Sequence, residues 1–315
     1  MNVVVIGGDG FVGSHIARKF VRENARVVVF GAKVDQNLLA DVETQIIREE
    51  GDITDWSTVM SALLSHRPDV AIHLAAFGAG KDGLAKSAQH SPKKALDVNI
   101  NGFYNVLEAC RLAGVKRVLW SGSSTVFGGA EEYGEEPVKE EAARNPSLFY
   151  GATKAFAEMM SRYFRDVHQM EISCLRLPLL YGPGKWYKGA GAALADIFEG
   201  AFRDGETVVL CGPEQLDLMY VKDVAELFYH AAVHDGKLEE TYNIVGHTHS
   251  IAEMAEYIKQ LVPRYPVRLD VRRPAVVYPL MDAAKMRAEL GFVPKYTMEA
   301  ACKDYIQELG GMNSD

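Results

Sequence analysis

The stretch MNVVVIGGDGFVG, residues 1–13, decides the fold of this chain. Its residues 3–6 form an unbroken apolar run, which is typical of a strand buried on both faces. The glycines that follow have the spacing Gly8-x-Gly10-x-x-Gly13, and an apolar-periodic run after them predicts a helix. This spacing matches the dinucleotide-binding fingerprint, whose glycines permit a tight turn, close approach of a pyrophosphate and close helix packing. We therefore expect a phosphate-binding turn between a buried strand and the start of a helix.

Composition excludes several classes of protein. The chain has 315 residues, a formal net charge of −8 and 48% hydrophobic residues, which is ordinary for a globular protein. It has no basic block, so we expect no nucleic-acid partner, and no apolar run long enough to cross a bilayer, so we expect no membrane partner. The cysteines lack CxxC spacing, which predicts small buried side chains, a reducing compartment and a cytoplasmic location. They are Cys110, Cys174, Cys211 and Cys302.

Strand and helix patterns alternate along the first half of the chain. This alternation predicts an α/β fold with a doubly wound parallel sheet. The strands are expected at residues 3–6, 26–30, 44–48, 70–76, 115–120 and 171–177.

The chain is expected to divide into two parts. A dinucleotide-binding domain spans residues 1–177, with a returning segment at about 220–247. A smaller C-terminal substrate lobe is formed by residues 178–219 and 248–315. The stretch 77–92 leaves the end of a strand and interrupts the alternation, so it is either a functional loop or a surface insertion.

The end of the second strand bears on the choice of cofactor. In a dinucleotide-binding fold, this position normally carries an acid that binds the adenine ribose of NAD. Here it is Gly31, and Lys33 follows two residues later. The missing carboxylate and the nearby cation predict a slight preference for NADP(H) over NAD(H). The alternative is that Lys33 is a solvated lysine in a turn.

Three residues form a candidate catalytic group. Tyr150 and Lys154 are four residues apart on a predicted helix, so they share one face. A nearby ammonium typically lowers a tyrosine pKa by roughly one to three units, which brings the hydroxyl into range for proton exchange with an alcohol. Ser123 ends the preceding strand and can hold the substrate oxygen. The group predicts hydride transfer between a nicotinamide and a secondary alcohol or ketone.

The chain resembles the extended short-chain dehydrogenases/reductases of the NAD-dependent epimerase/dehydratase family. The resemblance implies a Rossmann-type fold in which Tyr150 is the acid/base and Lys154 lowers its pKa and binds the nicotinamide ribose. It also places the catalytic hydroxyl at Ser123 and a structural asparagine at Asn99. The motifs that carry it are GGDGFVG (7–13), GD (51–52), HLAA (73–76), DVNING (97–102), SGSSTVFG (121–128), YGATK (150–154) and LYGPG (180–184).

The resemblance further implies binding residues and a homodimer. Asp52 is expected to contact the adenine, and the backbone near Pro178 the nicotinamide. Dimers of the family form through the helices that here span 96–113 and 149–167. The cofactor residues expected are Gly7, Gly10, Phe11, Val12, Gly13, Gly31, Lys33, Asp52, Ile53, Leu74, Ala75, Ala76, Tyr150, Lys154 and Pro178. The substrate residues expected are Phe77, Ser123, Ser124, Leu179 and Trp186.

Departures from the family pattern narrow the range of reactions and substrates expected for this chain. Ser124 and Thr125 stand where the family's dehydratases carry an acidic pair, so elimination of water lacks its acid and base. Leu179 and Leu216 stand where nucleotide-sugar enzymes carry an asparagine and an arginine. An unpaired diphosphate is costly to desolvate against leucine. We therefore expect an oxidoreductase for a small, non-nucleotide alcohol or ketone.

Two other functions use the same fold. The alternative enzyme is an NAD-dependent sugar or nucleotide-sugar epimerase with the same Ser-Tyr-Lys triad. A cofactor-sensing binding protein without turnover is a third possibility, against which the intact triad argues.

Histidine and glutamate clusters elsewhere are expected to be solvated, and no metal site is expected. His230 and His234 have metal-ligand spacing on a helix but no third ligand. His247 and His249 are interpreted in the same way. The glutamate-rich stretch 131–141 is expected to be a solvated loop.

Overall fold

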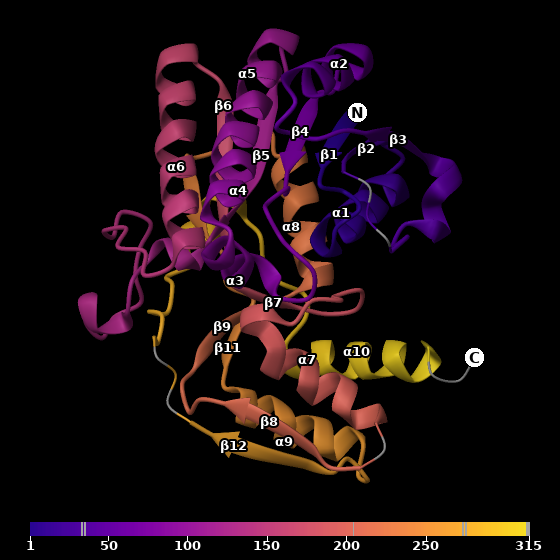
Figure 1. Ribbon diagram of the computed structural model, residues 1–315, viewed down its shortest axis with the longest axis vertical. Helices are drawn as coiled ribbons and strands as arrows, with labels where there is room; N and C mark the ends of the chain where they lie inside the picture. Colours follow the sequence, from indigo (N-terminus) through magenta and orange to yellow (C-terminus); the bar gives the residue numbers. More distant parts are fainter. Residues whose placement is uncertain (33, 35, 204, 273, 275, 313–315) are drawn as a thin grey trace.

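The computed structural model describes residues 1–32, 34, 36–203, 205–272, 274 and 276–312 (Figure 1). Its centre is a seven-stranded sheet in the order β10-β6-β5-β4-β1-β2-β3, in which every neighbouring pair is parallel. The expected α/β fold with a parallel sheet is confirmed. The strands are β1 (Asn2–Ile6), β2 (Arg26–Gly31), β3 (Ile46–Glu50), β4 (Val70–His73), β5 (Arg117–Ser123), β6 (Glu171–Leu177) and β10 (Thr241–Asn243). Strand β3 begins later than expected because Ala40–Gln45 form a 3₁₀ helix.

Helices cover both faces of this sheet. Alternate residues of a strand point to opposite faces, and β1 divides in this way between two hydrophobic clusters. Val3 and Val5 pack with α1 (Phe11–Arg22) and α8 (Val221–Val233). Val4 and Ile6 pack on the other face. The helices there are α2 (Trp56–His66), α5 (Phe103–Ala113) and α6 (Phe149–His168).

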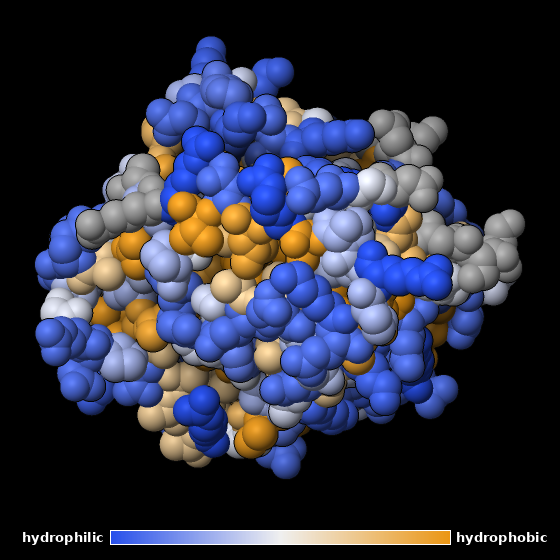
Figure 2. Space-filling view, turned by 90° about the horizontal axis from the view of Figure 1, so that it is seen from below, coloured by the Kyte–Doolittle hydropathy of each residue, from blue (hydrophilic) through white to orange (hydrophobic). Residues whose placement is uncertain are grey.

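A smaller lobe lies below the main sheet in Figure 1. It has a three-stranded sheet in the order β11-β9-β7 and a two-stranded sheet of β12 and β8. Its strands are β7 (Leu179–Tyr181), β8 (Thr207–Cys211), β9 (Leu216–Tyr220), β11 (His247–His249) and β12 (Val267–Val271). Its helices are α7 (Ala192–Glu199), α9 (Ile251–Leu261) and α10 (Met298–Met312). Figure 2, seen from this side, shows polar residues over most of the face with smaller apolar areas between them.

The stretch 77–92 is more ordered than the sequence indicates. It contains α3 (Gly83–His90), and α4 (Pro92–Leu96) follows directly. Ala88 of α3 is fully buried in a cluster with Tyr150 of α6, so this helix covers the candidate site. Eight residues that begin with Gly83 give too short a periodic pattern to predict a helix.

No helix within the described ranges is long and apolar enough to cross a membrane.

Candidate active site

The glycine turn between β1 and α1 leaves its backbone bare. Gly7 has φ +82°, and a Cβ there would lie 2.9 Å from the backbone nitrogen of Ala75. A Cβ on Gly13 would overlap the carbonyl oxygen of Gly7. Helix α1 begins after Gly10, and no side chain caps its first N–H groups. A bare turn at the positive end of a helix fits the pyrophosphate of a dinucleotide.

Tyr150 and Lys154 come together on the buried face of α6. Tyr150 is 8% exposed and Lys154 is 5% exposed. The Nζ of Lys154 lies 5.7 Å from the centre of the Tyr150 ring and 5.5 Å from that of Trp120. It donates a hydrogen bond to the carbonyl oxygen of Ser121, 2.8 Å away. The structure thus places this pair against the carboxyl end of β5.

Ser123 is the last residue of β5 and lies beside the start of α6. Its Oγ is 2.8 Å from the Oγ1 of Thr125 and accepts the Thr125 N–H at 3.2 Å. A Cβ on Gly151 would overlap the carbonyl oxygen of Thr125. Gly151 therefore lets α6 approach the serine turn. Sequence analysis missed this role, although the glycine directly follows Tyr150.

Asn99 joins the strand end after β4 to the tyrosine helix. Its Oδ1 accepts the N–H of Phe77 at 2.8 Å. Its Nδ2 donates to the Oγ1 of Thr153 at 3.1 Å, and that hydroxyl donates to the carbonyl oxygen of Tyr150 at 2.7 Å. Asn99 is only 6% exposed. Its hydrogen bonds position Phe77 and, through Thr153, the backbone of Tyr150. Thr153 was also missed by sequence analysis, and its spacing three residues after Tyr150 is the only signal.

Burial controls the protonation of the pair. It raises the pKa of Tyr150 far above its usual value, and the nearby Tyr187 adds to the effect. It lowers the pKa of Lys154 to about 8. The pKa of Tyr150 thus shifts in the direction opposite to the one expected from Lys154, because burial disfavours the charged phenolate. The role of Lys154 toward Tyr150 stays a prediction.

The segment after β7 folds over the glycine turn. The ring of Tyr187 meets Phe11 edge-on at 6.4 Å, and Trp186 meets Tyr187 edge-on at 5.7 Å. The N–H of Lys188 donates to the carbonyl oxygen of Lys81 at 3.1 Å. Two loops therefore meet beside the glycine turn, and the role of Trp186 toward a substrate stays a prediction.

Comparison with known proteins identifies the family. The model of the NAD dependent epimerase/dehydratase family matches residues 3–245. The chain belongs to this family. Among curated relatives, the UDP-glucose 4-epimerase of Lactobacillus helveticus is 26% identical, covering 94% of this chain and 93% of the relative. The dTDP-glucose 4,6-dehydratase 1 of Escherichia coli (strain K12) is also 26% identical, covering 98% of this chain and 92% of the relative.

Solved structures of the extended short-chain dehydrogenase/reductase type match the whole chain. The UDP-glucose 4-epimerase of Thermus thermophilus, a complex with NAD, has a TM-score of 0.84 and 25% identity, covering 99% of each chain. The L-threonine 3-dehydrogenase of Trypanosoma brucei has a TM-score of 0.86, covering 99% of this chain and 98% of that one. At 21% identity it shows the fold alone. The expected Rossmann-type fold and family are thus confirmed.

The other residues expected to bind the cofactor lie in the segments that follow β3, β4 and β6. Leu74, Ala75 and Ala76 are half-buried after β4, and Pro178 is buried after β6. Ile53 is 5% exposed. Their roles toward a cofactor stay predictions.

Three further residues, Asp52, Gly31 and Lys33, are expected to contact the adenosine. Asp52 is exposed, and its Oδ1 accepts the N–H of Thr54 at 2.8 Å. Gly31 ends β2 next to Gly7, whereas Lys33 lies outside the described residues.

Several side chains expected to be solvated are not. The Nε2 of His230 lies 2.6 Å from the carbonyl oxygen of Leu290. The Nε2 of His247 lies 2.8 Å from the hydroxyl of Tyr181, and its Nδ1 lies 3.1 Å from that of His249. Within the described ranges, no group of three or more His, Cys, Asp or Glu could hold a metal ion.

Glu140 is the exception in the glutamate-rich stretch. It is 7% exposed, and its Oε1 accepts the N–H of Asn243 at 2.8 Å. Its carbonyl oxygen accepts from Arg176 at 3.0 Å. The stretch thus ties β10 and β6 together, a contact between segments far apart in the sequence.

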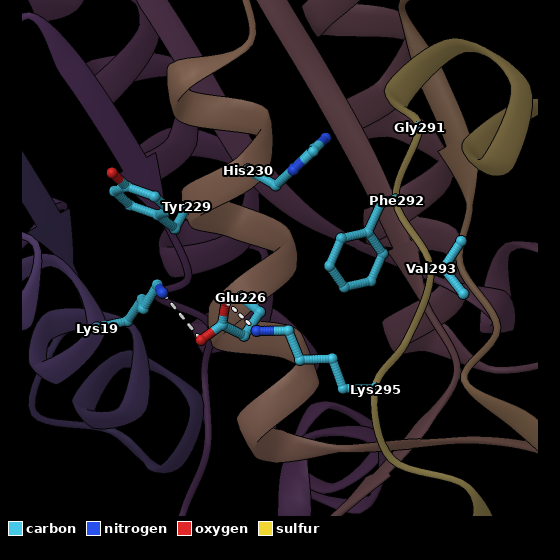
Figure 3. Close-up of a pocket in the computed structure, with 8 residues that line it drawn as sticks. All are labelled: Lys19, Glu226, Tyr229, His230, Gly291, Phe292, Val293 and Lys295. Carbon is cyan, nitrogen blue, oxygen red and sulfur yellow. Dashed lines mark hydrogen bonds and ion pairs between the residues drawn. The ribbon is translucent and has the colours of Figure 1, made fainter.

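A pocket of about 360 Å³ lies elsewhere, between α1, α8 and residues 291–295 (Figure 3). Glu226 points toward Lys19 at 2.9 Å and Lys295 at 3.3 Å across it. Helices α1 and α8 cover the sheet face opposite to α6. The pocket therefore does not belong to the Tyr150 site.

Proposed function

We propose that this chain is an NAD-dependent epimerase of a sugar or nucleotide sugar. In this reaction a secondary alcohol is oxidised, and the ketone is reduced again on its other face. The proposal is supported by the position of Tyr150 and Lys154 on α6 against β5, which ends at Ser123, and by the bare glycine turn between β1 and α1. The whole-length likeness to UDP-glucose 4-epimerases supports this reaction over a net oxidation.

Each residue has a defined task in this proposal. The glycine turn and the N-terminus of α1 hold the pyrophosphate. The nicotinamide, when bound, accepts and returns the hydride. Ser123 donates to the reacting oxygen, while Tyr150 exchanges its phenolic proton with the same atom. Lys154 offers its ammonium to the ribose and to the hydroxyl of Tyr150. The raised pKa of Tyr150 keeps the proton available when a ketone must be protonated.

A dehydratase is disfavoured by the residues beside Ser123. Ser124 and Thr125 carry hydroxyls, and the Thr125 hydroxyl already meets Ser123 at 2.8 Å. A hydroxyl of this kind is too weak an acid and base to drive loss of water at neutral pH.

The second candidate is a dehydrogenase for a small substrate without a nucleotide. Leu179 on β7 and Leu216 on β9 favour it, because neither offers a charge or a donor to a diphosphate. The slight preference for NADP(H) stays a prediction here, since one of the two residues behind it, Lys33, lies outside the described residues.

The proposal includes a homodimer through α5 and α6, which lie side by side in Figure 1. These helices expose several large apolar side chains, and such patches on a soluble protein mark interaction sites. The residues are Tyr104 (48% exposed), Leu112 (48%), Phe156 (51%), Met159 (65%), Tyr163 (56%) and Val167 (55%).

The state of the cofactor after purification tests the reaction. An epimerase must keep its dinucleotide through the catalytic cycle, so the purified protein is expected to release about one equivalent on denaturation. Incubation with UDP-hexoses, dTDP-hexoses and free sugars, without added cofactor, is then followed by NMR for the epimer. A protein that is free of dinucleotide and accumulates a ketone only with added cofactor supports the second candidate.

A further inference from the structure

Arg48 of β3 reaches into the glycine turn. Its Nη1 forms an ion pair with the carboxylate of Asp9, between Gly8 and Gly10. Its Nε and Nη2 bind the carboxylate of Glu43 at 2.7 and 2.8 Å. Its Nη2 also donates to the Oδ1 of Asn37 at 2.9 Å. Nothing in the proposed reaction uses this cluster.

The cluster lies where the fold places the adenine ribose. Arg48 pairs in register with Val29, two residues before Gly31, so its contact with Asp9 crosses β2 close to the carboxyl end of that strand. That end is Gly31, and a Cβ built on it would lie 3.7 Å from Gly7. The ribose of a dinucleotide binds at this strand end. Asp9 and Arg48 are therefore its neighbours.

The charges of the cluster favour one kind of ribose. A guanidinium has five N–H donors, and Arg48 uses its Nε, Nη1 and Nη2 on protein oxygens. Among the described residues of the cluster, Arg48 is one cation between two carboxylates, Asp9 and Glu43, and Lys33 lies outside the described residues. The neighbouring Arg18 is also engaged, by Asp41 at 2.8 Å and by the carbonyl oxygen of Leu38. A 2′-phosphate here meets excess negative charge, whereas a 2′-hydroxyl meets hydrogen-bond acceptors.

We propose that Asp9, oriented by Arg48, selects NAD(H) over NADP(H) and replaces the acid that is missing at Gly31. This inference rests on the proposed function only in that the chain binds a nicotinamide dinucleotide. It reverses the preference predicted from Gly31 and Lys33.

Exchange of NADH or NADPH into the full-length protein tests the inference, with nicotinamide fluorescence as the readout. The wild type is expected to bind NADH more tightly. Asp9→Asn removes one charge at constant shape, so the affinity ratio is expected to move toward NADPH by about tenfold. Asp41→Asn is the matched control, because it makes the same change in the neighbouring pair with Arg18, and it is expected to leave the ratio unchanged.

Salt gives a second reading that needs no variant. Repulsion of a 2′-phosphate is screened by salt, so NADPH affinity is expected to rise relative to NADH between about 0.05 and about 0.5 M. An unchanged ratio in Asp9→Asn overturns the inference. The inference is also overturned if the wild type prefers NADPH, salt weakens this preference and Arg48→Gln abolishes it. Arg48 would then bind the 2′-phosphate. Failure of both dinucleotides to bind overturns the proposed function itself.

Discussion

Lys154 donates its Nζ hydrogen bond to the carbonyl oxygen of Ser121, 2.8 Å away, and has no carboxylate partner among the described residues. The nearest acid on α6 is Glu158, one helical turn further. That carboxylate is bound by Arg176 at 2.7 Å and by Arg144. Lys154 is thus a buried ammonium whose hydrogen-bond partner is the neutral carbonyl group of Ser121. Burial lowers its pKa to about 8. A charge kept in such a place destabilises the fold.

Lys154→Met is therefore expected to raise the melting temperature at about pH 7 while abolishing turnover. The pKa of the lysine falls from 10.5 in the unfolded chain to about 8 in the folded one. Between these values the unfolded chain binds more protons, so wild-type stability rises with pH. The advantage of the variant is then largest below about pH 8 and shrinks toward about pH 10.5.

Thermal and urea unfolding at several pH values measure this effect. Lys188→Met is the control, because Lys188 is half-exposed and meets Asp196 at 2.5 Å. It is expected to change stability little. A Lys154→Met protein that melts below the wild type at pH 7 contradicts the argument.

Tyr150→Phe is expected to lower kcat by roughly two to four orders of magnitude, because it removes the transferable proton and keeps the ring. The packing against Ala88 of α3 survives, so dinucleotide affinity stays nearly constant. Single-turnover kinetics and NADH fluorescence separate the two effects. Tyr187→Phe, which removes the hydroxyl of the ring against Phe11, is the control and is expected to lose far less. Wild-type turnover in Tyr150→Phe would remove this residue from the reaction.

Asn99→Ala is expected to slow the reaction through geometry. It leaves the N–H of Phe77 and the hydroxyl of Thr153 without their partner. A lost buried hydrogen bond of this kind costs about 1–3 kcal/mol. We expect lower kcat with the amount of dinucleotide retained by the protein nearly unchanged. Thr153→Val is expected to reproduce part of the loss, and Thr153→Ser to restore it. Equal activity in Thr153→Val and Thr153→Ser contradicts this positioning role.

Local sequence signals predict much of this molecule. The glycine turn is specified by neighbours in the chain, because Gly7 needs a positive φ and Gly13 has no room for a Cβ. Several strands of the sheet contain apolar runs, such as residues 3–6 of β1, which the order of residues reveals. Tyr150 and Lys154 share a face because a helix has a fixed period.

Long-range contacts explain what sequence analysis did not predict. Arg48 meets Asp9 only after β1, β2 and β3 pair. Glu140 looks like one more solvated acid until Asn243 covers it. The high pKa of Tyr150 depends on burial under α3 and the loop of Tyr187, which sequence spacing does not reveal.

Met159→Glu on α6 is expected to convert the proposed dimer into a monomer. Met159 is 65% exposed at the centre of the apolar face, and a buried, unpaired charge there opposes association. Leu64→Glu on α2, at a site that is 48% exposed, is the control. Light scattering after gel filtration measures both. A wild-type monomer, or a dimer unaffected by Met159→Glu, places the interface elsewhere.

Whether the substrate is a nucleotide sugar depends on whether the protein can bind its diphosphate. Leu179 and Leu216 offer no donor, so a nucleotide sugar loses water around its phosphates without replacement. Lys185 is the group most able to compensate. Its Nζ donates only to the carbonyl oxygen of Leu180, at 2.8 Å, and no carboxylate among the described residues pairs with it. Burial lowers its pKa to about 8, so its charge is already weakened.

The second candidate, a dehydrogenase for a small substrate, therefore predicts that calorimetric titration of UDP-, GDP- and dTDP-sugars into the cofactor-bound protein shows no saturable binding in the low-micromolar range. Free sugars and small hydroxy compounds are titrated in parallel. Low-micromolar binding of a nucleotide sugar contradicts the expectation drawn from the two leucines. Lys185→Met would then test whether Lys185 binds the phosphates, because loss of binding assigns them to this residue. Lys188→Met is the control and is expected to leave binding intact, since the Lys188 ammonium is paired with Asp196.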